Sequence, residues 1–353
     1  MGKIKYILFM FLFSLPAFAL TVTDLLNREV SLEKPANRVI ALGTSLSYVT
    51  YLNSVDKVIG IEAIELKDVK KRAYTYVNRN KIKSLPIVGQ GGKAKRPNLE
   101  AIITLRPDVI FTIVQDKSEA DLLSKQLNIP VVVVGYGVES VEFEDIYKSL
   151  QIMGKILNKQ NRAESLISYI KNLQKEFKRV EKRSRAYIGA VAYKGLQGIT
   201  STKTDFMPFR FSQVENIAFD LQKKGHLFID KEYLLMKNPS RIFLDNAGWE
   251  LILQEFNKDK SYFKRLKAFK DSSYLILANT FYYINIDQML ANSFFIAKTI
   301  YPKQYKDLDP IKKSNEIFEA FVGEPLYDMF KEDTGGFQKV YLENEKLKLK
   351  SIL

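Results

Sequence analysis

A long amphipathic segment near the middle of the chain places the strongest constraint on its fold. In the stretch Asn161–Arg183, NRAESLISYIKNLQKEFKRVEKR, apolar residues recur at steps of three and four, with Lys and Glu between them. This spacing puts the apolar side chains on one stripe of an α-helix. Asn161, followed three positions later by Glu164, predicts the N-cap. At about 1.5 Å per residue the helix would be about 33 Å long, roughly the width of a small domain.

The segments on either side of this helix each carry an α/β pattern of their own. We therefore predict an α/β protein of two lobes, each a mostly parallel sheet flanked by helices, joined by this single long interdomain helix. Function is expected in the cleft between the lobes. The predicted boundaries are residues 20–160 for the N-terminal lobe, 161–183 for the linking helix and 184–353 for the C-terminal lobe. The alternative is an ordinary surface helix of one domain.

The first 19 residues have the composition of a secretory signal peptide. Lys3 and Lys5 precede an apolar run, Tyr6–Phe18, and Ala17-Phe18-Ala19 fits an A-x-A cleavage site. The chain has no cysteine, which excludes disulfides and a lipid anchor attached through Cys. We expect an exported, periplasmic, soluble protein that is a monomer. A retained N-terminal anchor is the alternative.

The composition describes a basic chain with enough apolar residues for full cores. Hydrophobic residues make up 46%, and the formal net charge of +14 falls to +12 when Lys3 and Lys5 leave. Nucleic acid is the usual partner of such a charge. However, the lysines are scattered along the expected helices and the protein is expected to be exported, so we predict no nucleic-acid partner. A positive field that attracts anionic ligands, or simple solubility, explains the charge better.

In the N-terminal half, continuous apolar strands alternate with helical segments, which predicts a parallel sheet covered on both faces. Strands are expected at Arg38–Leu42, Val58–Ile61, Ile87–Val88, Val109–Val114 and Val131–Val134. Ligands of such sheets bind beyond the carboxyl ends of the strands. Candidate binding residues at these ends are Thr44, Gln115 and Tyr136.

The same alternation returns after the long helix. Strands are expected at Ala186–Tyr193, Arg241–Leu244 and Tyr274–Ala278. Helices are expected at Gln213–Phe219, Trp249–Gln254, Ile286–Ile300, Lys312–Phe321 and Glu324–Glu332. Aromatic residues and one arginine gather near the strand ends of this half, as a bulky anionic ligand would require. The candidates are Arg210, Trp249, Tyr282 and Tyr283.

A short repeat links the two halves. Asn98–Phe111 and Asp230–Phe243 each begin with a capping residue, place a glutamate two residues later, and pass through an apolar helix to a proline and an Ile-Phe strand. The spacing from glutamate to proline is identical, so we predict two equivalent helix–turn–strand units. Glu100 and Glu232 then occupy matched positions, either as residues that complement a helix dipole or as a two-point docking mark for arginines of a partner.

Catalytic chemistry has little support in the sequence. There is one histidine, His226, and no cysteine, which excludes the usual zinc sites and leaves His226 alone for Ser-His or Cys-His catalysis. The segment Gly89–Gly92 lacks the ending of a phosphate loop, although Lys93, Lys95 and Arg96 after it could face an anion. His226 beside Gly225 is either a turn histidine or a ligand. We therefore expect a binding protein and no enzyme.

Three groups of segments carry a family resemblance: Thr23–Val30 with Pro35–Val39, Asn98–Ile102 with Leu105–Ile110, and Leu290–Lys298 with the tail through Phe337. In these segments the chain resembles the periplasmic binding proteins of iron–siderophore and vitamin B12 importers. The resemblance implies delivery of a metal chelate to the permease dimer of an ABC importer. It also implies that Glu100 and Glu232 pair with permease arginines. Arg210, His226 and Tyr282 or Tyr283 fall in stretches that contact the chelate in related proteins.

The resemblance and the charge together favour an Fe(III) chelate of the siderophore type, with no covalently bound cofactor. An anionic complex such as a ferric catecholate would pair with Arg210 and lie between Tyr282, Tyr283 and Trp249. His226 would complete the iron shell where the chelate leaves a position open. A corrinoid such as cobalamin, a haem or a nickel chelate would suit the same fold, and an enzyme with its active site in the cleft is the rival class.

Overall fold

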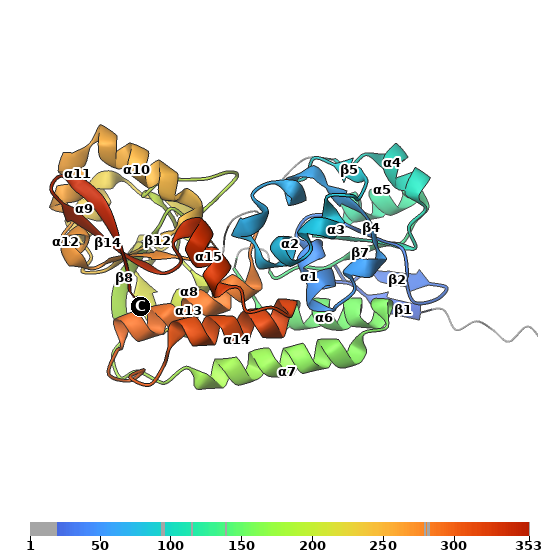
Figure 1. Ribbon diagram of the computed structural model, residues 1–353. Helices are drawn as coiled ribbons and strands as arrows, with labels where there is room; N and C mark the ends of the chain where they lie inside the picture. Colours follow the sequence, from blue (N-terminus) through green and yellow to red (C-terminus); the bar gives the residue numbers. More distant parts are fainter. Residues whose placement is uncertain are drawn as a thin grey trace, which may run out of the picture.

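The structure, a computed structural model, describes residues 20–92, 96–113, 116–137, 140–278, 280 and 283–352. Figure 1 shows two α/β lobes side by side, with helix α7 (Gln160–Glu176) along the lower edge, running from the N-terminal lobe toward the C-terminal lobe. This confirms the predicted class of fold. The signal-peptide prediction concerns residues outside the described ranges.

The N-terminal lobe is built on a five-stranded, fully parallel sheet in the order β5-β4-β3-β6-β7. Its strands are β3 (Val39–Ala41), β4 (Val58–Glu62), β5 (Ile87–Gly89), β6 (Val109–Thr112) and β7 (Val131–Val133). The chain moves outward from β3 to one side and from β6 to the other. The carboxyl ends of β3 and β6 therefore form the point where ligands bind in such sheets.

Helices cover both faces of this sheet because its strands are apolar on both sides. They are α1 (Ser45–Tyr51), α2 (Ala73–Val77), α3 (Arg79–Ile82), α4 (Leu99–Leu105), α5 (Lys117–Leu127) and α6 (Phe143–Leu157). Three short 3-10 turns, η1 (Val55–Lys57), η2 (Ala63–Leu66) and η3 (Val69–Lys71), connect them. The chain enters the lobe through an antiparallel hairpin of β1 (Leu20–Thr23) and β2 (Glu29–Leu32).

The C-terminal lobe carries a six-stranded mixed sheet in the order β10-β8-β12-β13-β14-β15, whose last two strands run antiparallel. Its strands are β8 (Ser184–Gly189), β10 (Val214–Asn216), β12 (Ile242–Asp245), β13 (Ser273–Ile276), β14 (Gln338–Glu343) and β15 (Lys346–Ser351). A separate antiparallel ribbon is formed by β9 (Ser201–Lys203) and β11 (His226–Phe228). In this sheet the corresponding ligand-binding point lies between β8 and β12.

The remaining helices pack around this second sheet and along the base of both lobes. They are α8 (Met207–Phe211), α9 (Lys231–Lys237), α10 (Trp249–Lys258), α11 (Lys260–Arg265), α12 (Ala268–Asp271), α13 (Ile286–Ile300), α14 (Pro310–Val322) and α15 (Tyr327–Thr334), with 3-10 turns η4 (Ile217–Leu221) and η5 (Asn246–Gly248). In the part of the chain that the structure describes, no helix is both long and apolar enough to span a membrane.

The largest apolar core is continuous from one lobe to the other. It joins buried residues of α1, α6 and α7 to those of α13 and α14. At its centre the rings of Tyr51 and Phe321 meet edge to face, with centroids 4.9 Å apart, and Phe177 stacks on Phe294 at 4.4 Å. The lobes are thus held by a packed layer of helices, which favours a fixed geometry between them.

The linking helix is shorter than predicted at one end and starts one residue earlier at the other. Its N-cap is Lys159, whose carbonyl accepts from Ala163, because Asn158 in the left-handed region has just reversed the chain after α6. The prediction of Asn161 as the cap was wrong. The helix ends at Glu176 because Phe177 turns away to stack between Phe211 and Phe294. Residues 177–183 continue outside the helix.

One other prediction from local pattern needs correction. The helix expected at Gln213–Phe219 is the edge strand β10 followed by η4, because residues 214–216 pair in parallel with β8. The ribbon of β9 and β11 and the hairpin of β14 and β15 were not predicted. Short edge strands of this kind depend on their pairing partners more than on their own sequence.

The predicted repeat is confirmed as a structural duplication. Helices α4 and α9 have seven residues each, and both end in a left-handed residue, Arg106 and Asn238. Asn98 caps α4 through its side chain, whereas Asp230 occupies the cap position of α9 without a side-chain bond. Each helix then leads through a proline into a central strand, β6 or β12.

Candidate functional site

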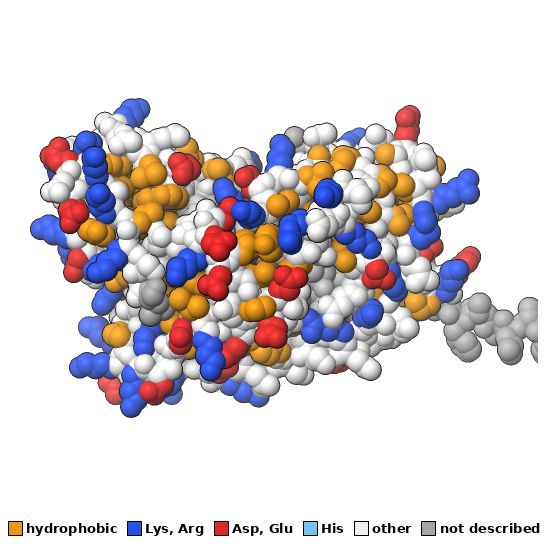
Figure 2. Space-filling model, in the orientation of Figure 1, with side chains coloured by type: hydrophobic (Ala, Val, Ile, Leu, Met, Phe, Trp, Pro, Cys, Tyr) orange, Lys and Arg blue, Asp and Glu red, His pale blue; other side chains and the backbone are white. Residues whose placement is uncertain are grey.

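A cavity of about 800 Å³ opens at the carboxyl edge of the N-terminal sheet. Its wall includes the ends of β3, β6 and β7, the inner face of α5, and Tyr283 from the C-terminal lobe. Figure 2 shows that the outline of the molecule dips between the two lobes, with basic side chains scattered over this face. The cavity lies where the topology of a parallel sheet places ligand sites, and it is large enough for a bulky small molecule.

Glu62, at the end of β4, supplies a buried carboxylate to the cavity wall. It is 5% exposed, and its Oε2 accepts from the backbone N–H of Gly43 at 2.7 Å. Gly43 follows β3 with φ +65°, and a Cβ there would lie 2.4 Å from Cγ1 of Ile113. Only glycine fits this turn, so the bend that brings Gly43 to Glu62 is fixed by the backbone.

Two phenols from different lobes line the cavity. Tyr136 follows β7, and Tyr283 precedes α13. Burial, with the nearby phenol of Tyr283, raises the pKa of Tyr136 far above its usual value. Burial, with the carboxylate of Glu62, raises the pKa of Tyr283 to about 12. Both side chains therefore stay protonated at neutral pH and can donate hydrogen bonds to oxygen atoms of a ligand.

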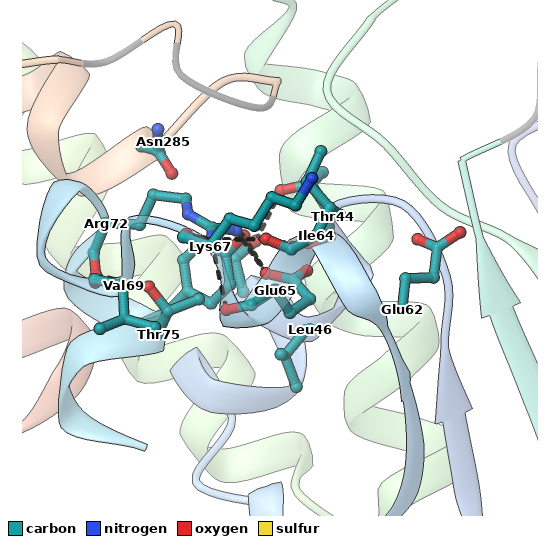
Figure 3. A network of polar contacts seen from close by, with 12 residues as sticks. Thr44, Leu46, Glu62, Ile64, Glu65, Lys67, Val69, Arg72, Thr75 and Asn285 are labelled. Atoms are coloured by element: carbon teal, nitrogen blue, oxygen red, sulfur yellow. Dashed lines mark hydrogen bonds and ion pairs between the residues drawn. The ribbon is translucent and has the colours of Figure 1, made fainter. Parts of the chain in front are cut away.

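A buried polar network fixes the segment that follows Glu62 (Figure 3). The fully buried guanidinium of Arg72 pairs with the carboxylate of Glu65, donates to the Tyr74 hydroxyl at 2.9 Å, and donates to the carbonyl of Lys67 at 2.8 Å. Burial raises the pKa of Glu65 to about 7, against the opposing effect of Arg72. In Figure 3 Glu62 stands apart from this group, on the strand beside it.

The same segment also contacts the C-terminal lobe. The carbonyl of Lys71 accepts from Nε2 of Gln288 on α13 at 3.0 Å, and Lys70 lies 3.7 Å from Asp333 on α15. Asn285, the cap position of α13, projects toward the Arg72 network from above in Figure 3. The network thus holds one face of the lobe interface and, through β4, the position of Glu62.

The predicted ligand residues at the N-terminal strand ends differ in whether they line the cavity. Tyr136 lines the cavity. Thr44 is fully buried at the cap of α1, behind Gly43, so its side chain does not reach the cavity wall. Gln115 lies outside the described residues. In the C-terminal lobe Tyr283 lines the cavity, and Tyr282 lies outside the described residues.

Arg210 is placed beside the cavity instead of in it. Its guanidinium lies 2.8 Å from Asp205 of its own lobe and 3.7 Å from Glu142, the residue before α6 of the other lobe. Both partners are carboxylates, and all three side chains are partly exposed. In this structure Arg210 bridges the lobes, which is a different role from the expected pairing with a chelate oxygen.

His226 lies in β11, where its ring stacks on Tyr193 with centroids 4.0 Å apart and an interplanar angle of 8°. The Ser201 hydroxyl donates to the carbonyl of Val191, so it accepts from Nε2 of His226 at 2.7 Å. Burial, with the charge of Lys203, lowers the pKa of His226 to about 4. The imidazole is neutral at pH 7, and one of its nitrogens is already engaged.

Three further candidates do not line the cavity. Trp249 begins α10 and packs half-buried against the core of the C-terminal lobe. Glu100 and Glu232 are both exposed, in the first turn of α4 and of α9. In Figure 1 these two helices lie on the sides of their lobes away from α7.

The charges around the cavity were mostly missed by sequence reasoning. Carboxylates of Glu62, Asp116, Glu119 and Asp145 line it, and among the described lining residues Arg96 alone is cationic. A glutamate at the end of an otherwise apolar strand was the signal that could have identified Glu62. Within the described ranges no group of three or more His, Cys, Asp and Glu side chains could hold a metal ion.

Comparison with known proteins agrees with this architecture. The family model of the periplasmic binding proteins matches residues 49–270, more than half of the chain. The chain belongs to the periplasmic binding protein family. Family members of this kind are solute-binding proteins that work with ABC importers, as the resemblance in the sequence implied.

Individual relatives are distant but cover most of the chain. The molybdate-binding protein MolA of Haemophilus influenzae is 22% identical over 329 residues, 85% of this chain and 90% of its own length. The TroA-like periplasmic binding protein FepB of Veillonella parvula superposes with a TM-score of 0.66 at 21% identity, covering 86% of this chain and 96% of its own. Helicobacter pylori CeuE with a nickel–histidine complex superposes with a TM-score of 0.63 at 16% identity. The match covers 89% of this chain and 98% of the CeuE chain. At these identities the structures support the fold alone.

Proposed function

We propose that this protein captures a metal chelate in the cleft between its lobes and delivers it to an ABC importer. The observation that carries the proposal is the cavity of about 800 Å³ at the carboxyl edge of the N-terminal sheet, with a protonated phenol from each lobe on its wall. A ligand held there contacts Tyr136 and Tyr283 together. Two-lobe contact of this kind gives the importer a bound state that differs from the empty one.

A ferric chelate of the siderophore type fits these features best. The cavity has room for a bulky molecule, far more than a small oxyanion fills. Its phenols donate hydrogen bonds, which suits a ligand that presents oxygen atoms. The iron is cargo, carried inside its chelate. Relatives named for molybdate and for a nickel–histidine complex, together with corrinoids and haem, define the alternatives for the experiment.

Binding and release, with no chemical conversion, is the activity we assign. The paired glutamates Glu100 and Glu232 are exposed at equivalent positions of the two lobes. A permease dimer presents two equivalent surfaces, so two matched carboxylates suit it as docking points for arginines. We propose these contacts as the way in which the loaded protein finds its importer.

The ligand is tested by calorimetric titration of the purified protein. The probes are iron(III) complexes of a tripodal tris-catecholate and of a trihydroxamate, with cobalamin, haemin, nickel–histidine and molybdate. We expect tight one-to-one binding of at least one ferric complex, with no release of a converted product. Tight binding of cobalamin or molybdate with no response to either ferric complex would overturn the iron assignment. Turnover of a chelate would overturn the assignment as a binding protein.

The phenols are tested by Tyr136→Phe and Tyr283→Phe, with Tyr341→Phe on the peripheral strand β14 as the matched control. Each cavity variant loses one hydrogen bond to the ligand, which corresponds to a loss of affinity of about three- to tenfold. The control should bind as the wild type does. If all three variants bind equally well, the ligand does not occupy this cavity.

Docking is tested by reversing both charges, Glu100→Arg with Glu232→Arg. The side chains are exposed, so affinity for the chelate and thermal stability should stay close to the wild type. Uptake of the bound ferric complex into cells that depend on this protein should be lost. Uptake at the wild-type rate would mean that the glutamates only complement their helices.

A further inference from the structure

The antiparallel ribbon of the C-terminal lobe carries an aromatic cluster that the cavity does not use. We define the ribbon cluster as Tyr193, His226 and Phe228. The ring of His226 lies between the other two: it stacks on Tyr193 at 4.0 Å and meets Phe228 edge to face at 4.8 Å. Tyr193 and Phe228 also contact edge to face at 6.4 Å. The three rings form one continuous aromatic surface.

This surface is presented to solvent. Tyr193 is 38% exposed and Phe228 58%, and neither belongs to the apolar cores formed by the described residues. His226 is neutral at pH 7 and is held by Ser201, so its ring is fixed without carrying a charge. Rigid, exposed aromatic groups that do not stabilise a core are typical of binding surfaces. The ammonium of Lys194 lies 5.4 Å from the centroid of the Tyr193 ring.

The ribbon cluster lies at the cleft-facing edge of the C-terminal sheet. Val191, just after β8, donates to the carbonyl of Ser201 in the ribbon, and Ala192 donates to the hydroxyl of Thr280 at 3.1 Å. Thr280 in turn donates to Asp245 at the end of β12. Tyr283, three residues after Thr280, lines the cavity. Tyr193 therefore belongs to the same edge of the lobe as the C-terminal wall of the cavity.

A second line of contacts connects the ribbon to the N-terminal lobe. Lys203 pairs with His226 in the ribbon, and Asp205, two residues later, holds Arg210 at 2.8 Å. Arg210 reaches Glu142, which lies one helical turn before Asp145 on the cavity wall. The ribbon thus stands beside the mouth of the cavity, across the cleft from the start of α6.

We propose that the ribbon cluster is the C-terminal lobe's half of the ligand site and takes the flat face of an aromatic ring in the chelate. The proposal rests on the proposed function and narrows its ligand class to chelates that carry aromatic ring systems. Offset stacking on Tyr193 and an edge contact from Phe228 are the geometries that such a ring prefers. A chelate held by the phenols of the cavity would place its peripheral groups on this surface.

The test compares two ferric ligands on the same variants. Tyr193→Leu and Phe228→Leu keep apolar volume and remove the π face, and both positions are exposed, so folding should be preserved. Phe219→Leu is the matched control, because Phe219 is also an exposed aromatic residue, at 64%, but lies in η4 and is not part of the ribbon cluster. Tyr193→Phe retains the ring and should restore binding.

For the iron(III) tris-catecholate complex we expect Tyr193→Leu and Phe228→Leu each to raise Kd about three- to tenfold, with no change for the control. Binding of the iron(III) trihydroxamate complex, which has no aromatic ring, should be unchanged in every variant. Three outcomes would overturn the ribbon proposal and leave the proposed function intact. The variants could lose equal affinity for both ligands, they could lose none, or the wild type could bind the trihydroxamate complex alone. Failure of the wild type to bind any metal chelate would instead remove the proposed function, and the ribbon proposal with it.

Discussion

The two lobes contain the same helix–turn–strand unit, but their sheets differ where they meet the cleft. In the N-terminal lobe α4 leads into β6, whose carboxyl end opens into the cavity beside Tyr136. In the C-terminal lobe α9 leads into β12, and the chain after it is packed closely against its neighbours. A Cβ on Gly248 would lie 2.2 Å from the carbonyl oxygen of Gln197.

Their buried charges differ as well. The N-terminal lobe buries Glu65 against the guanidinium of Arg72, whereas the C-terminal lobe buries Asp245 against the Thr280 hydroxyl and the N–H of Ala247. The duplicated helices occupy matched positions in the two lobes, and Leu99 of α4 is the residue of these two helices that lines the cavity. In our proposal the duplicated helices serve docking, and the segments that differ at the strand ends serve ligand binding.

The largest expected effect comes from breaking the buried ion pair of the N-terminal lobe. Arg72→Ala leaves the carboxyl of Glu65 and several carbonyls buried without their donor, so the free energy of unfolding should fall by about 3–5 kcal/mol. Arg185→Ala in β8 removes an arginine that also has two carboxylate partners but is exposed, and should cost about 1 kcal/mol or less. Urea unfolding of both variants checks this. Equal losses would mean that burial does not distinguish the two arginines.

The buried carboxyl of Asp245 in the C-terminal lobe should make the stability of the protein depend on pH. Burial raises the pKa of Asp245 to about 7, so the folded state holds this proton more tightly than the unfolded state. The stability that this gives is complete below the ordinary pKa of the carboxyl and is lost as the pH rises through about 7. The free energy of unfolding of Asp245→Asn, measured relative to that of the wild type, should therefore rise by about 3 kcal/mol when the pH is raised from about 4.5 to about 8. A difference between the two proteins that does not change with pH would contradict this.

A pair of glycine variants tests the difference in packing directly. Gly248→Ala forces a methyl group onto backbone atoms of Gln197 and Ala190, which should cost about 2–3 kcal/mol of unfolding free energy. Gly135→Ala on the cavity wall meets only Cδ1 of Leu25, at 3.6 Å, and should cost less than about 1 kcal/mol. Thermal denaturation distinguishes them. If Gly135→Ala is the more damaging variant, the N-terminal edge is more tightly packed than we describe.

The smallest effect is expected from Arg210→Ala, the ion pair between the lobes. Its partners are exposed, so unfolding free energy should change by about 1 kcal/mol or less. Chelate affinity should stay within about threefold of the wild type, because Arg210 lies outside the cavity. A loss of affinity of a hundredfold would restore the role that the sequence suggested for this residue.

Much of the fold followed from apolar patterning. The parallel strands of the N-terminal lobe are continuous apolar runs apart from terminal or single Gly, Glu and Thr residues, and helix α13 has the predicted bounds, Ile286–Ile300. The failures occur where a distant contact decides the outcome. Phe177 leaves its helix to stack on Phe294, and Val214–Asn216 pairs with β8 although its local pattern is helical. A window of sequence contains neither partner.

The site was harder to predict than the fold. The ends of strands indicated the edge of the sheet where the cavity lies, and Tyr136 and Tyr283 line that cavity. The pattern could not show that Thr44 is buried behind Gly43, or that Arg210 already has two carboxylate partners. Glu62 was not selected either. Its place at the end of an otherwise apolar strand was a signal, but one carboxylate at a strand end has no distinctive spacing.

The central claim is that a metal chelate binds in the cleft, between the cavity of the N-terminal lobe and the ribbon of the C-terminal lobe. Crystals grown with the iron(III) tris-catecholate complex, measured at the iron absorption edge, would locate the metal by its anomalous scattering. We predict one strong peak in the cleft, with the chelate in contact with Tyr136 and Tyr283. A peak on the outer surface of either lobe, with the cavity empty, would contradict the account.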